Sequence, residues 1–262
     1  SKSNEIILSS LCSRTYFIDF ITGKTSRPSV DVHNTIKGTP SIDPFFKNLY
    51  VGQGIPNHLP IGRLVIDLNK TKESQFIDRD SRALRHWYAS DASPIEVGGY
   101  LFWPGEDGSL YKYSRKQGYL RLVSALRYTI NDSAPGIENS LCAYRNYGWF
   151  GDNHGSIICV NLNTMKPVWY YDNHDDIDGT IVCEVENGTP YIYCGCEVDK
   201  QGMSGTCYFV KLNGLTGEQV WVQTIPCNRI QIGEKVLDGG MYCTPLLGRG
   251  DAKGFIFANI CR

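Results

Sequence analysis

The sequence predicts an all-β fold built from repeated four-stranded antiparallel units. The first observation is a glycine-led apolar strand that recurs with spacings of 46, 47 and 50 residues, starting at Gly62, Gly108, Gly155 and Gly205. The second is the alternation of apolar and polar side chains within these segments, which is typical of β-strands. The third is composition, since the chain is 12% aromatic and holds 27 glycines without helical periodicity.

Each repeat has the same four parts in order. A small polar segment with glycine or proline opens the unit, as at 38–42 and 91–95, and an apolar strand follows, as at 48–52. The glycine-led strand is third, and a turn then leads to an outer strand. A period in the high forties is that of one four-stranded β-propeller blade. Complete blades are predicted over 36–78, 90–128, 131–173 and 178–225.

The two ends of the chain predict partial blades. The strands expected at 5–10 and 16–20 have the pattern of the second and third strands of a blade. Those expected at 242–247 and 254–261 have the pattern of a first and a second strand. The prediction is therefore one β-propeller domain over 1–262, with four complete and two partial blades.

One segment carries a family resemblance. Residues 210–221 run VKLNGLTGEQVW, and residues 17–24 run FIDFITGK. This resembles the repeat of the PQQ-like (quinoprotein-like) propeller family, in which apolar residues alternate around Asp or Asn before T-G-x-x-x-W. The resemblance implies a wheel of seven or eight blades, so the remaining blades are expected in cis or on a second fragment. Trp169 and Trp221 are predicted to pack as wedges between blades.

Composition narrows the partners and the compartment. A net charge of −1 argues against nucleic acid, which needs a concentrated basic surface. The sequence has no apolar run long enough to span a bilayer, and the start at 1–5 has no signal-peptide pattern. Most of the ten cysteines lie in alternating apolar segments, which predicts free, buried thiols. An extracytoplasmic location, periplasmic, cell-surface or secreted, is favoured, and the expected thiols leave a cytoplasmic one open.

Three blade-opening acids are the first candidates for a binding site. Equivalent positions of successive blades meet at one end of the central channel, so Asp91, Asp132 and Asp178 are expected to gather there. The competing interpretation is that each carboxylate ties its own turn. Aromatic and cationic side chains in similar loop-proximal places complete the candidate ligand-binding set: Trp87, Trp103, Arg145 and Trp149.

The acidic stretch at 172–179 raises the question of calcium, because hard cations bind several carboxylates. The EF-hand register fails here, since with Gly179 at its sixth position the first position is His174 and the twelfth is Val185. The alternative is an acidic, solvated connection between blades. The sequence assigns no metal ligands.

No catalytic residue is assigned. The sequence holds no nucleophile elbow, phosphate-binding glycine loop or H-E-x-x-H motif. The resemblance implies a quinone held over Ca²⁺ by a Glu/Asn/Asp set, often with an adjacent Cys-Cys pair, and this sequence has no such pair. The prediction is a non-catalytic scaffold that uses no cofactor and recognises a protein, peptide or glycan. The alternative is a quinoprotein-type oxidoreductase that uses PQQ and calcium.

Overall fold

The computed structural model describes residues 4–55 and 58–261. Residues 1–3 of the 1–5 segment, in which no signal-peptide pattern was found, lie outside the described residues. In the described part, all regular structure is β-strand except one 3-10 turn, η1 (Gly250–Ala252). None of the described residues forms a helix with the length and apolar character needed to cross a membrane. The chain divides into two compact units, 1–134 and 135–262, and each is described by itself.

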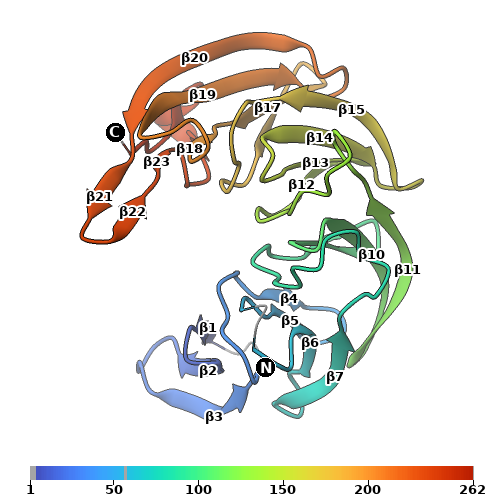
Figure 1. The fold of residues 1–262 in the computed structure, drawn as a ribbon. Helices are drawn as coiled ribbons and strands as arrows, with labels where there is room; N and C mark the ends of the chain where they lie inside the picture. Colours follow the sequence, from blue (N-terminus) through green and yellow to red (C-terminus); the bar gives the residue numbers. More distant parts are fainter. Residues whose placement is uncertain (1–3, 56–57, 262) are drawn as a thin grey trace. The chain divides into compact units, whose positions relative to one another are not determined.

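The first unit contains three consecutive antiparallel sheets (Figure 1). The opening sheet has three strands, β1 (Glu5–Ser10), β2 (Arg14–Asp19) and β3 (Thr25–Asp31). The second has four, β4 (Ser41–Asp43), β5 (Asn48–Gly52), β6 (Gly62–Asp67) and β7 (Lys72–Asp78). The third also has four, β8 (Ile95–Val97), β9 (Tyr100–Gly105), β10 (Ser109–Lys116) and β11 (Tyr119–Arg127).

The second unit contains two four-stranded sheets and three short pairs. One sheet is formed by β12 (Cys142–Tyr144), β13 (Tyr147–Gly151), β14 (Ser156–Asn161) and β15 (Lys166–Asp172). The other is formed by β16 (Val182–Glu186), β17 (Thr189–Cys194), β19 (Ser204–Asn213) and β20 (Gln219–Asn228). The pairs are β18 (Glu197–Val198) with β23 (Gly239–Gly240), β21 (Ile230–Ile232) with β22 (Lys235–Leu237), and β24 (Leu246–Leu247) with β25 (Ile256–Phe257).

Strand β6 shows why the glycine-led segments read as continuous apolar runs. All six of its residues are buried, because both faces of its sheet are covered. Leu64 and Ile66 face the β1–β3 sheet, in a cluster with Phe17, whereas Val65 faces the β8–β11 sheet, in a cluster with Trp103. The period of two therefore divides one strand between two cores, as the packing of successive propeller blades requires.

The second unit repeats this arrangement. Val210 and Leu212 of β19 pack toward the β12–β15 sheet, and Cys207 and Phe209 pack on the other face with Met241. All ten cysteines lie among the described residues and are free thiols, as predicted. Five are fully buried, and they act as small hydrophobic side chains: Cys159, Cys194, Cys196, Cys207 and Cys227.

The T-G-x-x-x-W pattern has a direct structural meaning in the second unit. Gly217 has a left-handed φ of 76°, and a Cβ added there would lie 2.7 Å from Cδ2 of Trp169 in the preceding sheet. The glycine of one blade thus lies against the tryptophan of the blade before it. This contact confirms the prediction that Trp169 is a wedge between neighbouring sheets.

The fold class is as predicted, with four complete four-stranded sheets over 41–78, 95–127, 142–172 and 182–228 in the described residues. The opening partial sheet has one strand more than the two assigned from sequence, because β3 pairs with β2. The closing partial sheet is the β24–β25 pair. The single propeller domain over 1–262 and the seven- or eight-bladed wheel remain predictions.

Candidate functional site

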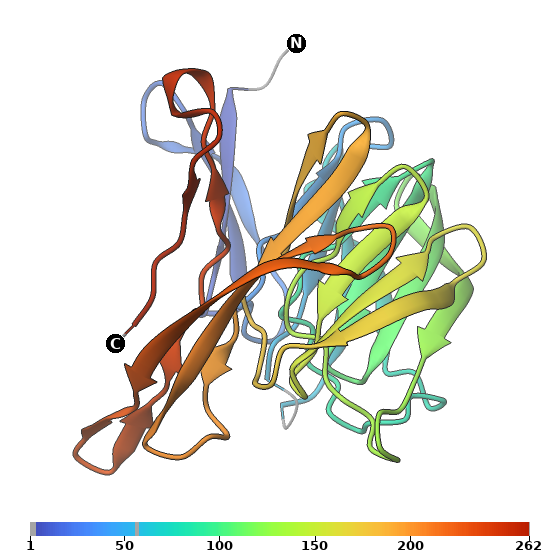
Figure 2. The same ribbon diagram turned by 90° about the horizontal axis from the view of Figure 1, so that it is seen from above.

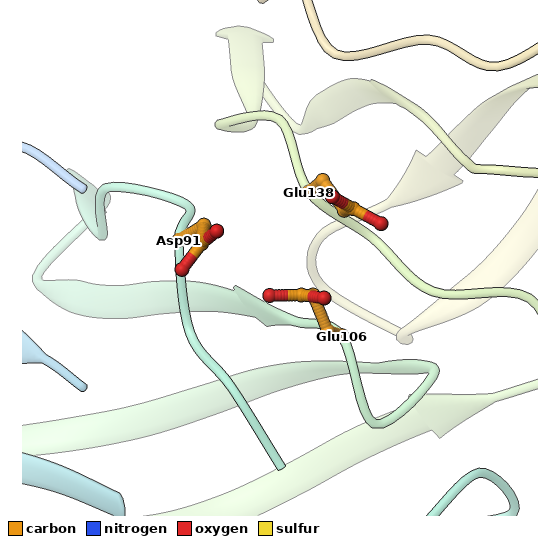
Figure 3. A group of neighbouring side chains, drawn as sticks. All are labelled: Asp91, Glu106 and Glu138. Atoms are coloured by element: carbon orange, nitrogen blue, oxygen red, sulfur yellow. The ribbon is translucent and has the colours of Figure 1, made fainter. Parts of the chain in front are cut away.

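Asp91 lies in the loop that enters β8, and the structure places Glu106, which follows β9, beside it (Figure 3). A carboxylate oxygen of each lies within 4.8 Å of the other. Lys37 Nζ lies 2.9 Å from Asp91 Oδ2, and an added Cβ at Gly38 would lie 2.1 Å from the Asp91 carbonyl oxygen. The opening segments of two successive blades therefore meet here, and Glu106 was not assigned from sequence.

Asp132 has a different setting. It is exposed in a turn where Asn131 and Asp132 both have positive φ, 50° and 61°, and where Ile130 and Ser133 form an isolated antiparallel bridge. Asn and Asp tolerate this left-handed conformation better than other side chains. A turn-forming role therefore explains Asp132, and its meeting with Asp91 and with Asp178 of the second unit remains a prediction.

Asp178 belongs to a cluster of carboxylates in the second unit, here called the Glu197 cluster and made of Asp176, Asp178, Glu197 and Asp238. Glu197 is only 4% exposed, and its backbone N–H donates to the Asp176 carbonyl at 2.8 Å. Burial, the charge of Asp178 and a hydrogen bond with Asp178 raise the pKa of Glu197 to about 10. Glu197 is therefore protonated at neutral pH and shares its proton with Asp178.

Burial also raises the pKa of two neighbours of Glu197. Burial raises the pKa of Asp176 to about 7, although Lys200, whose Nζ lies 3.6 Å from Asp176 Oδ2, opposes the shift. Burial, followed by the charges of Glu197 and Asp238, raises the pKa of Tyr242. Arg229 Nη2 lies 2.5 Å from Asp238 Oδ1, so this carboxylate has a cationic partner. The cluster is therefore a group of closely spaced acidic side chains in which Glu197 and Asp176 keep their protons to higher pH than ordinary carboxyl groups do.

The hydrogen bonds of Asp175 bear on the calcium interpretation of the 172–179 stretch. Asp175 is fully buried and is used within the protein, because it accepts hydrogen bonds from the Lys200 N–H at 3.2 Å and from Gln201 Nε2 at 3.0 Å. The alternative, a solvated connection, is therefore wrong for Asp175, which ties the 199–201 loop to the blade.

The two inner tryptophans of the candidate set are core side chains. Trp103 is fully buried and packs near Tyr50, with 6.2 Å between ring centroids, and the Arg63 guanidinium lies 5.7 Å from its ring. Trp149 is also fully buried, and its Nε1–H donates to the Gly214 carbonyl at 2.9 Å. Both rings fill the space between sheets, so neither presents a face to a ligand.

The two outer residues of the set are exposed. Trp87 lies in the connection between β7 and β8, beside His86, whose Nδ1 lies 2.7 Å from the Tyr88 hydroxyl. Arg145 occupies the β12–β13 turn with a φ of 55°, and its guanidinium lies 5.1 Å from the Tyr144 ring.

A surface that the sequence did not predict lies on the β21–β22 hairpin. All six of its strand residues are exposed, and in Figures 1 and 2 it projects beyond the end of β20. Ile230 pairs with Leu237, so their side chains share one face with Ile232. These three side chains are 49%, 51% and 62% exposed, respectively. They form the surface here called the hairpin face.

Comparisons with known proteins support the fold assignment. No family profile and no curated protein matches the chain. Among solved structures, BamB from Moraxella catarrhalis is similar with a TM-score of 0.60 and 13% identity, over 90% of this chain and 64% of that one. The quinohemoprotein alcohol dehydrogenase ADHIIG from Pseudomonas putida HK5 has a TM-score of 0.62 and 14% identity, over 87% of this chain and 41% of that one.

Both of these proteins have PQQ-like β-propeller folds, and the chain shares that coarse fold relationship. The chain spans less than two thirds of either protein's length. At this sequence identity the likeness concerns the fold alone, because propellers with the same blades perform unrelated functions. The function therefore depends on the residues of this chain.

Proposed function

We propose that the protein is a non-catalytic β-propeller scaffold that binds a protein partner through the hairpin face. The observation that supports this proposal most directly is the grouping of Ile230, Ile232 and Leu237 on one exposed side of β21–β22. The four-stranded sheet that ends in β20 is complete without this hairpin. Exposed apolar groups that the core does not need are typical of interaction surfaces.

The chemistry of the face favours a protein or peptide over a glycan. Its three central side chains are aliphatic, and Lys235, which pairs with Ile232, places one cation on the same side. Aliphatic side chains gain free energy by burial against other apolar groups, whereas sugar recognition uses aromatic platforms and many polar contacts. Among the candidate ligand-binding residues, Trp87 of the first unit is an exposed aromatic side chain of the kind that binds sugars.

One observation weighs against the alternative, a quinoprotein oxidoreductase with PQQ and calcium. Trp103 and Trp149 are buried between sheets, so neither is available to stack on a quinone. We therefore propose a function without a cofactor.

We also propose an extracytoplasmic location. The free thiols remain compatible with either compartment. Fractionation of the source cells with an antibody would decide, since recovery in the cytoplasmic fraction would overturn the proposal.

The binding proposal is tested in two steps. A photo-crosslinking amino acid at position 232 identifies a partner in intact source cells, and the same residue at Val220, exposed on β20, serves as the control position. The purified partner is then titrated against the wild type and the Ile232→Ser/Leu237→Ser variant. We expect the double variant to bind about ten-fold or more weakly, the effect of removing interface anchors, and Val220→Ser to bind as the wild type does.

Equal affinities for the wild type and the double variant would overturn the proposal. A separate assay addresses the alternative function. Protein supplied with PQQ and Ca²⁺ is examined by absorbance and by dye-linked oxidation of alcohols and sugars. Reduction of the dye would establish the oxidoreductase instead of the scaffold.

A further inference from the structure

A depression of about 470 Å³ lies in the second unit, beside the start of β16 and against the β24–β25 pair. Seven of the eight residues that line it have no polar side-chain atom, among them Val182, Leu246 and Phe257. The eighth is Arg249, which lies in the loop between β24 and β25. A volume of this size is in the range of small-molecule sites, roughly 300–1,000 Å³.

The loop between β24 and β25 forms one wall of the depression. The Gly248 N–H donates to the Phe255 carbonyl at 2.9 Å, and the Ala252 N–H donates to the Arg249 carbonyl at 3.1 Å. A Cβ added at Gly248 would lie 1.9 Å from the Ala252 carbonyl oxygen, so the loop can fold back this closely because residue 248 is glycine. The loop thereby holds Ala252 and Arg249 beside the same apolar surface.

The apolar surface is open to solvent. Leu246 pairs with Phe257, so their side chains share one face of the β24–β25 pair, and they are 66% and 53% exposed. Leu247 and Ile256 form the next pair and pack against the core of the second unit. The core therefore uses the other face, and an apolar ligand that covers Leu246 and Phe257 gains free energy by removing them from water.

The depression has one charged residue, and this residue is available to a ligand. Arg249 is exposed, and its guanidinium forms no ion pair or hydrogen bond with any residue of 4–55 or 58–261. Arg249 also lines a second depression of about 340 Å³, which shares Leu247 and Gly248 with the first. The charges of Lys253 and Glu184 in that second depression cancel, so Arg249 leaves one net positive charge on the whole lining.

We propose that the larger depression binds an aliphatic carboxylate, with its chain on Leu246 and Phe257 and its carboxylate group at the Arg249 guanidinium. One net positive charge favours one negative charge on the ligand, and a planar carboxylate matches the fork of donors that a guanidinium presents. The apolar lining favours a hydrocarbon chain over a sugar, whose hydroxyl groups would lack partners there. Because Arg249 is exposed, its side chain can turn to the ligand without leaving a buried position.

The test uses sodium octanoate, whose binding to the purified full chain is followed by ligand-observed NMR during titration. Octylammonium has the same chain with the opposite charge, and hexanoate has the same charge with two methylene groups fewer. We expect saturable binding of octanoate below about 10 mM and about five-fold or more weaker binding of octylammonium because of its charge. Hexanoate should bind about five- to fifteen-fold more weakly than octanoate, since less of the chain is buried.

The substitution Arg249→Glu tests the position of the carboxylate group. It reverses the charge of an exposed residue, so it should weaken octanoate binding about five-fold or more and tighten octylammonium binding. Opposite changes for the two probes cannot arise from loss of the fold. Lys166→Glu is the matched control, because Lys166 is an exposed cation on β15 of the same unit and lines neither depression. This control should bind both probes as the wild type does.

The substitution Leu246→Ser tests the position of the chain. It removes an exposed apolar side chain from the wall and should weaken the binding of octanoate and octylammonium alike, about three- to ten-fold. Circular dichroism and thermal midpoints check the fold of each variant.

Any of three results overturns the proposal. These are no binding of octanoate at about 10 mM, equal binding of octanoate and octylammonium, and unchanged octanoate binding in Arg249→Glu. The last result would mean that the chain adsorbs to an apolar surface elsewhere on the protein.

The outcome is independent of the scaffold proposal. The Ile232→Ser/Leu237→Ser variant should bind octanoate as the wild type does, because neither residue lines the depressions. Arg249→Glu should in turn leave binding of the protein partner at the hairpin face unchanged. Failure of one proposal therefore leaves the other standing.

Discussion

The indole N–H groups of Trp149 and Trp169 donate to the same carbonyl oxygen, that of Gly214, at 2.9 and 3.1 Å. Both tryptophans belong to the β12–β15 sheet, and Gly214 follows β19 of the next sheet. A Cβ added at Gly214 would lie 2.8 Å from Trp149 Cζ2, so the backbone can come this close because the residue is glycine. One peptide group thus joins two sheets through two aromatic side chains.

The neighbouring glycine offers a stability test. Gly217→Ala should lower the free energy of unfolding by about 2–5 kcal/mol, since the left-handed φ is unfavourable by about 1–2 kcal/mol and the overlap with the Trp169 ring adds about 1–3. Gly23→Ala is the matched control, because Gly23 has a φ of 67° and open space around it. Urea unfolding measures both, and equal losses would show that the glycine–tryptophan contact contributes nothing.

A second prediction concerns a buried amide of the first unit. Asn48 Nδ2 donates to the Lys116 carbonyl and Asn48 Oδ1 accepts from the Gly118 N–H, both at 2.7 Å. Asn48→Leu leaves both backbone groups without a partner and should lower the free energy of unfolding by about 2–4 kcal/mol. Asn69→Leu, at an exposed position of the turn between β6 and β7, should change it by less than about 0.5 kcal/mol. Similar losses in both variants would rule out a specific role for the Asn48 tie.

The Glu197 cluster predicts how stability depends on pH. Glu197 has a folded pKa of about 10, far above the ordinary carboxyl value, so the folded protein binds more protons than the unfolded chain across the neutral range. The free energy of unfolding should therefore fall as the pH rises from about 5 to about 8, by at most about 1.4 kcal/mol per pH unit from this group. Asp176, with a pKa of about 7, adds to the fall up to neutral pH.

Glu197→Gln should flatten this pH dependence and stabilise the protein at the alkaline end, because the amide keeps a donor and carries no charge. Glu218→Gln is the control, since Glu218 is exposed on the turn before β20. Chemical denaturation at several pH values measures the slopes. A slope in Glu197→Gln as steep as in the wild type would contradict the assignment of the proton to Glu197.

Cys12 should be the most reactive thiol. It is exposed, and hydrogen bonds from Ser10 and Tyr16 lower its pKa, with Ser10 Oγ 3.1 Å and the Tyr16 hydroxyl 3.4 Å from the sulfur. Burial raises the pKa of Cys159 to about 12, so that thiol should stay inert in the native state. Iodoacetamide labelling followed by peptide mass spectrometry should modify Cys12 first, and the midpoint of its pH profile should lie at a lower pH than that of an ordinary thiol.

Ser10→Ala should shift the labelling profile of Cys12 to higher pH, because one stabilising hydrogen bond to the thiolate is lost. Cys261 is the internal control, since it is exposed and distant in sequence. Faster labelling of Cys261 than of Cys12 would contradict the prediction.

The blades were predictable from the sequence because each strand is specified by the alternation of side chains within a short segment. A strand such as β6 is buried on both faces, and the equivalent strand recurs in each repeat. The turn glycine at 217 and the outer-strand Trp169 belong to recurring parts of successive repeats, so both can be recognised in the sequence. The hairpin at 230–237 was missed because its strands have three residues each and its apolar side chains face solvent. Periodicity analysis detects segments that pack in a core, and this segment does not.

The candidate site was less predictable, because it depends on residues far apart in the chain. Asp178 was singled out, but Glu197 reaches it only through the turn after β17, and its high pKa arises from burial that no local pattern reveals. Arg63 has the sequence pattern of an ordinary strand residue. Its burial between two sheets depends on Gly105 of the facing sheet, which leaves room for the guanidinium. Trp103 and Trp149 were placed at a blade mouth because sequence order does not tell which face an aromatic side chain takes.

The ties between sheets share one property that bears on how such a chain can evolve. Asn48, Gln75 and the two indoles on Gly214 all hold main-chain atoms of the neighbouring sheet. An amide or carbonyl of the backbone is present whatever residue occupies the receiving position, except that proline lacks the donor. A receiving position such as the exposed Lys116 is therefore free to drift under mutation while the blades stay joined, whereas Gly214 is held to glycine by the approach of Trp149. A propeller built this way can keep its architecture long after its sequence has ceased to reveal its ancestry.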